Sequence, residues 1–103
     1  MKIGSIDLTK SVYIPKEGSF KPVGELVSVE LFCADLGAAS ITVELQGSLS
    51  KTRWDTLQEA GSDISETLTS GVALVQTFEV DPEIELRFKC ATGTGTVEYV
   101  IFE

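Results

Sequence analysis

Apolar and polar residues alternate strictly through the middle of the chain, and this alternation predicts β-strands. The pattern is clearest over residues 25–35 and 40–47, and it returns over 72–80 and 84–90. A period of two puts one face of each strand on a core and leaves the other face to solvent or to a partner. The expected core consists of apolar residues on the repeating positions of these four strands: Val27, Val29, Leu31, Ile41, Val43, Leu45, Leu74, Phe78, Leu86 and Phe88.

Weaker strand signals come before and after these segments. Short strands are expected at 6–8 and 12–14, and another at 53–58. The stretch 59–70 is the least regular, because Asp63-x-x-Glu66 resembles a helical capping box while the Gly-Ser pair before it interrupts any helix. We expect a loop there, with a short strand or a single helical turn.

Two strands carry large apolar residues on the face opposite the expected core. The final strand, 96–103, places Val100 and Phe102 there, and Phe32 has the same kind of position in 25–35. Large apolar residues grouped on an exposed sheet face mark interaction surfaces. The alternative is that the N-terminal segment covers the final strand on both faces.

Seven or eight short strands with turns between them, and no convincing long helix, predict an all-β fold. We expect an antiparallel β-sandwich with jelly-roll or related Greek-key topology. The sandwich domain is expected over 25–103, and an extended N-terminal arm, irregular at Pro15 and Pro22, over 1–24. The arm has four lysines against two acids, a net charge of +2, whereas the rest has four bases against fourteen acids, a net charge of −10. The arm is therefore expected to dock on an acidic surface, with apolar anchors that include Tyr13 and Phe20.

The chemistry of the side chains favours a binding or structural protein over an enzyme. The chain has no histidine, which removes the usual general base, the Ser-His-Asp arrangement and the commonest zinc ligand. Its acidic residues gather near turns without the spacing of a calcium loop, so neither a metal nor a cofactor is expected. A net charge of −8 disfavours both nucleic acid and anionic membranes as partners.

Cys33 and Cys90 fall on inward faces of their strands. They are expected to be two free buried thiols, and a disulfide is the alternative if their strands are neighbours. The N-terminus has no continuous apolar secretory segment, and no apolar run approaches the length of a membrane span. We therefore expect a protein made in a cytoplasm, where thiols stay reduced.

Trp54 is the only tryptophan of the chain. Burial tendencies favour a place in the core or at a sheet edge, packed with Leu57. The alternative is an exposed ring that stacks on a sugar, as in carbohydrate-binding modules.

A series of short motifs runs through residues 40–103. It consists of Ile41-Thr-Val-Glu-Leu-Gln-Gly-Ser48, Trp54-x-x-Leu57, Ser70-Gly71, Phe78, Pro82, Arg87-Phe88 and Thr92-Gly-Thr-Gly-Thr-Val97. In this order the motifs resemble the small β-sandwich virion proteins of tailed bacteriophages, which are head-decoration (cement) or head–tail accessory proteins. The chain departs from them after Ser48, where it has Leu49-Ser50-Lys51 in place of the usual Asn/Asp-Gly turn.

The resemblance implies a virion structural protein, and most specifically a capsid-decoration protein that stabilises the head shell. Its partners would be the major capsid protein or another virion protein, together with further copies of itself in a trimer or dimer. The expected interface residues are Tyr13, Phe20, Phe32, Val100 and Phe102. The alternative function is a carbohydrate- or receptor-binding module with Trp54 as its platform.

Overall fold

The computed structural model describes all 103 residues and contains eleven strands and no helix. The structure thus has no helix that could span a membrane. The strands are β1 (Lys2–Asp7), β2 (Tyr13–Ile14), β3 (Leu26–Phe32), β4 (Ser40–Ser48), β5 (Asp55–Thr56), β6 (Gln58–Glu59), β7 (Ser62–Asp63), β8 (Ser65–Thr69), β9 (Leu74–Glu79), β10 (Glu85–Cys90) and β11 (Thr96–Phe102). The all-β prediction is confirmed.

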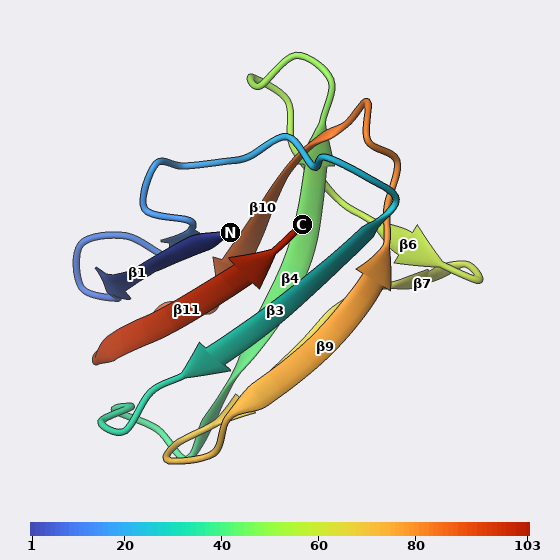
Figure 1. Ribbon diagram of the computed structural model, residues 1–103. Coiled ribbons are helices and arrows are strands. Elements are labelled where there is room, and N and C mark those ends of the chain that lie inside the picture. Colours follow the sequence, from blue (N-terminus) through green and yellow to red (C-terminus); the bar gives the residue numbers. More distant parts are fainter.

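Two sheets pack face to face and form the sandwich (Figure 1). The front sheet has the strand order β1-β11-β3-β9, and the back sheet has the order β2-β10-β4-β5, with β8 also paired to β4. All the strand pairs are antiparallel. Successive main strands along the chain alternate between the two sheets. The exception is β4, after which the chain stays in the back sheet for β5 and β8. This strand order is that of a jelly roll, as the sequence predicts.

The core lies between the two sheets and is filled by the inward-facing apolar residues of both. Nine of the ten expected core residues are buried there, and the tenth, Leu74, is half-buried against the same cluster. The largest fully buried side chain is Tyr99, from the inward face of β11. Alternation along the strands therefore assigns the inward face correctly.

Residues 1–24 form part of this sandwich. β1 pairs with β11 along its whole length, and β2 pairs with β10. The backbone N–H of Lys16 donates a hydrogen bond to the Tyr99 hydroxyl at 3.0 Å. The segment contributes four residues to the core: Ile6, Leu8, Ile14 and Phe20. The structure therefore has no separate N-terminal arm, contrary to the expectation from the prolines and lysines, because the apolar residues of this segment complete the core.

The irregular stretch 59–70 contains strands and no helical turn. β6 and β7 form a small hairpin that projects from the sandwich, and β8 then pairs with β4 (Figure 1). The hairpin turns at Ala60 and Gly61, which have φ angles of 53° and 81°. Two successive residues with positive φ are typical of a type I′ turn, which matches the twist of a tight hairpin.

Candidate functional site

The outer face of the front sheet carries a group of large apolar residues among polar ones, and we call this group the apolar face. Val100 on β11 pairs with Ile3 on one side and Glu30 on the other, and Glu30 pairs with Val75. These four residues therefore lie side by side in a row across all four strands of the sheet. The apolar face consists of the large outward-facing residues Ile3, Leu26, Phe32, Val75, Val100 and Phe102. Side chains of this size on one face of a small domain mark an interaction surface.

Two acidic residues lie among these apolar side chains. Glu30 pairs in register with Val100 and Val75, and Glu98 pairs with Phe32. A shallow groove of about 270 Å³ lies between them, bordered by Ile3 and Phe32. No lysine or arginine forms an ion pair with either glutamate. A partner that covers this face would therefore need both apolar and basic groups.

The structure distributes the five expected interface residues over three places. Phe32, Val100 and Phe102 share the apolar face, where Phe102 is 62% exposed. Strand β1 pairs with the edge of β11 and leaves this face open, so the segment does not cover the final strand on both faces. Phe20 is only 3% exposed and packs in the core, which corrects its expected interface role. Tyr13 lies on the back sheet.

The outer face of the back sheet has a different character. Arg87 on β10 packs against two aromatic rings: its guanidinium carbon is 3.9 Å from the centroid of Tyr13 and 4.1 Å from that of Trp54. Its Nε donates a hydrogen bond to Gln46 Oε1 at 2.8 Å. Burial lowers the pKa of Arg87, and Tyr13 opposes this shift. We call Tyr13, Trp54 and Arg87 the aromatic–arginine stack.

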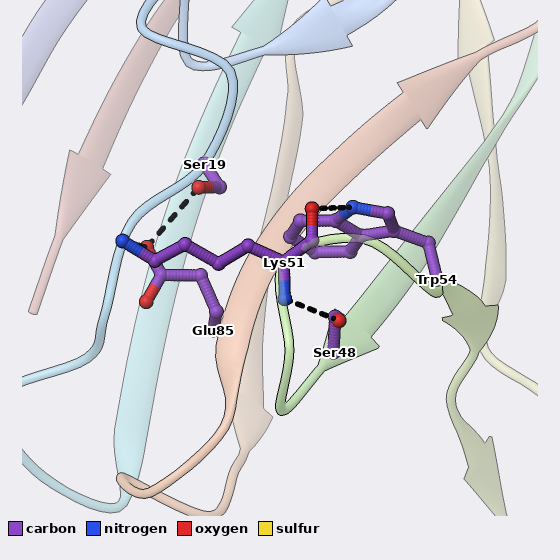
Figure 2. A network of polar contacts seen from close by, with 5 residues as sticks. All are labelled: Ser19, Ser48, Lys51, Trp54 and Glu85. Atoms are coloured by element: carbon purple, nitrogen blue, oxygen red, sulfur yellow. Dashed lines mark hydrogen bonds and ion pairs between the residues drawn. The ribbon is translucent and has the colours of Figure 1, made fainter.

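The loop between β4 and β5 orients Trp54 (Figure 2). Lys51 has a φ angle of 63°, and its carbonyl oxygen accepts a hydrogen bond from the Trp54 indole Nε1 at 3.2 Å. Its backbone N–H donates to Ser48 Oγ at 2.9 Å, and its Nζ lies 3.8 Å from Glu85. Left-handed backbone costs a non-glycine residue about 1–2 kcal/mol, so these contacts offset a local strain.

Trp54 lies outside the core and directly before the edge strand β5, so the structure excludes the core position and leaves the sheet edge and the ligand platform. It is half-buried and absent from the core, but one face of its ring already contacts Arg87. Tyr13, the other ring in contact with Arg87, is 41 positions away from Trp54 in the sequence. Strand alternation predicts that Arg87 faces outward, but no pattern in a single sequence predicts which rings cover it.

The acidic loops and the cysteines do not form a reactive centre. Asp81 accepts a hydrogen bond from the backbone N–H of Glu83 and so closes its own turn. No group of three or more His, Cys, Asp or Glu side chains could hold a metal ion. Cys33 and Cys90 are buried and unpaired, and burial raises the pKa of Cys33 and raises that of Cys90 to about 12. Both thiols stay protonated at neutral pH and are therefore poor nucleophiles.

No protein-family model, curated protein or solved structure matches this chain.

Proposed function

We propose that the chain is a structural protein of a bacteriophage virion, a capsid-decoration protein that binds the assembled head shell and stabilises it. The observation that carries the proposal is the apolar face, which extends across all four strands of the front sheet. The jelly-roll strand order and the motifs of residues 40–103 support it. A role of this kind requires an interaction surface and no catalytic group.

The apolar face would act by removing its side chains from water against the shell. Burial of apolar surface contributes roughly 25 cal/mol per Å², and the two glutamates favour a shell surface that offers lysine or arginine opposite them. A protein that binds only the assembled shell stabilises it by mass action. Copies that gather at local symmetry axes would add contacts between neighbouring capsid subunits.

Shell binding by matched surface variants tests this proposal. Shells assembled from the major capsid protein alone are mixed with the purified chain and sedimented. Phe102→Glu should reduce binding about tenfold or more, because it places a charge within the buried surface. Leu49→Glu is the matched control, since Leu49 is 82% exposed but lies in the loop after β4, away from the apolar face. Equal binding of Phe102→Glu and the unaltered chain, or no binding by the unaltered chain, would contradict the proposal.

A carbohydrate-binding module is the second candidate function. The observation that favours it is the presence of two aromatic rings, Tyr13 and Trp54, on the outer face of the back sheet. Aromatic side chains with polar neighbours are typical of sugar sites. The two functions use opposite faces of the sandwich, so substitutions on one face separate them.

A further inference from the structure

Arg87 has no carboxylate partner in a chain rich in carboxylates. The protein has sixteen acidic and eight basic residues, but its one ion pair within 4.0 Å joins Lys51 to Glu85. The Arg87 side chain makes a single hydrogen bond, from Nε to Gln46. Its terminal Nη groups donate to no protein acceptor and are not sealed from solvent. Four N–H donors of a fixed cation are therefore free to bind a ligand.

The acidic residues beside Arg87 are bound to other groups. Glu44 accepts a short hydrogen bond of 2.6 Å from the Thr56 hydroxyl. Glu85 accepts a hydrogen bond from Ser19 Oγ at 3.1 Å and lies at 3.8 Å from Lys51 Nζ (Figure 2). Neither carboxylate forms an ion pair with Arg87, so the guanidinium group stays unneutralised by them.

The aromatic–arginine stack also fixes the orientation of the guanidinium plane. Two rings, with centroids 3.9 Å and 4.1 Å from the guanidinium carbon, together with the Nε bond to Gln46 restrict the rotation of the group. A planar guanidinium with free Nη groups matches a carboxylate in a bidentate pair. Because the side chain is already ordered, binding loses little rotamer freedom. The strained loop at Lys51, which positions Trp54, belongs to the same arrangement.

The surroundings of Arg87 fit a saccharide better than a protein surface. The outward positions next to it on β4, β5 and β10 hold Glu44, Gln46, Thr56 and Lys89. None of the exposed large apolar residues of the chain lies on the outer face of a back-sheet strand. Protein interfaces usually have an apolar centre, whereas sugar sites combine ring surfaces with hydroxyl, amide and charged groups.

We propose that the outer face of the back sheet binds an acidic saccharide, whose carboxylate pairs with the Nη groups of Arg87 and whose ring packs against the exposed parts of Trp54 or Tyr13. This inference rests on the second candidate function and specifies its saccharide as acidic; because the site lies on the sheet opposite the apolar face, it does not depend on the docking of that face. A decoration protein with such a site would present it outward from the shell and could attach the particle to an acidic surface glycan.

Fluorescence of Trp54 measures this binding directly, since it is the only tryptophan of the chain. The probes are oligosaccharides that carry uronate or sialate residues, each with a neutral oligosaccharide of the same length as its counterpart. We expect at least one acidic oligosaccharide to change the emission saturably, and its neutral counterpart to bind about tenfold more weakly or not at all.

Two cationic variants separate the ion pair from general charge. Arg87→Lys keeps the charge but loses the bidentate fork, and should weaken binding about tenfold. Lys10→Gln, the control, removes an exposed cation of the turn after β1, outside the proposed site, and should change binding by less than about twofold. If Arg87→Lys does not fold, NMR on the unaltered chain replaces it: an acidic oligosaccharide should shift the side-chain N–H resonances of Arg87, and unchanged resonances would contradict the ion pair.

Three outcomes would overturn the inference: no response to any acidic oligosaccharide, equal affinity for the neutral counterparts, or tighter binding of an acidic peptide than of every saccharide. None of these outcomes would affect the shell-binding proposal, which is tested by Phe102→Glu.

Discussion

Phe88 packs at the centre of the core, between aromatic rings from two other parts of the chain. Its ring centroid lies 6.5 Å from that of Phe20 and 5.9 Å from that of Phe78. The Phe88→Ala substitution would leave a cavity between the sheets and should lower the free energy of unfolding by about 3–5 kcal/mol. Urea denaturation measures this loss. Phe102→Ala is the control, because its exposed ring should contribute less than about 0.5 kcal/mol; equal effects would show that the inward face is assigned wrongly.

The buried thiol of Cys90 makes the free energy of unfolding depend on pH in the alkaline range. Burial raises its pKa from 9.0 to about 12 in the folded protein. Below pH 9 both states hold the proton, but above it the unfolded state releases the proton while the folded state keeps it. Stability should therefore fall as pH rises above 9, by at most about 1.4 kcal/mol per pH unit from this group.

Comparison with Cys90→Ala isolates this contribution from the other groups that titrate in the same range. Unfolding in urea at several values between pH 8 and pH 10.5 should give a steeper decline for the unaltered protein than for the variant. Parallel declines would mean that the thiol is not buried as the structure shows.

At the scale of elements, the integration of residues 1–24 predicts the result of truncation. A chain that lacks this segment loses β1, β2 and four core residues. We expect it to show no cooperative unfolding transition by circular dichroism, because β11 would be left with an open edge above an incomplete core. The control keeps the segment but replaces its exposed lysines with glutamine: Lys10, Lys16 and Lys21. That variant should fold normally; a folded truncated chain would restore the idea of a separate arm.

Sequence patterns predict the long strands well and the short ones poorly. β3, β4, β10 and β11 each alternate over six or more residues, so their faces follow from local sequence alone. β2 has only two residues, and its place is set by pairing with β10, more than 70 positions away. The same distance separates Tyr13 from Arg87, which is why the aromatic–arginine stack could not be predicted. Non-local contacts of this kind leave no periodic signal in one chain.

The turn after β4 shows how a departure from a motif can be accommodated. The turn has Lys51 at a φ angle of 63°, where an Asn/Asp-Gly turn is absent. The lysine adopts the left-handed conformation that asparagine and glycine adopt more readily. Its backbone and side-chain contacts to Ser48, Trp54 and Glu85 compensate for that cost.

At the scale of the whole molecule, the two outer faces differ in a way that suits a protein between a shell and solvent. The apolar face has large side chains with two glutamates, and the back sheet presents polar groups and a stacked arginine. A symmetric assembly at shell axes predicts that the purified protein is a dimer or trimer. Light scattering should give two or three times the chain mass of 11.1 kDa. A mass of one chain at all concentrations would contradict the symmetric assembly.

An electron cryomicroscopy map of the purified virion tests the central claim most directly, because it shows whether the apolar face is covered and by what. The account predicts density for the jelly-roll sandwich on the outside of the head, with the outer face of β1-β11-β3-β9 against the shell and the outer face of the back sheet toward solvent. A virion without this sandwich, or one in which Phe102 and Val100 face solvent, would contradict it.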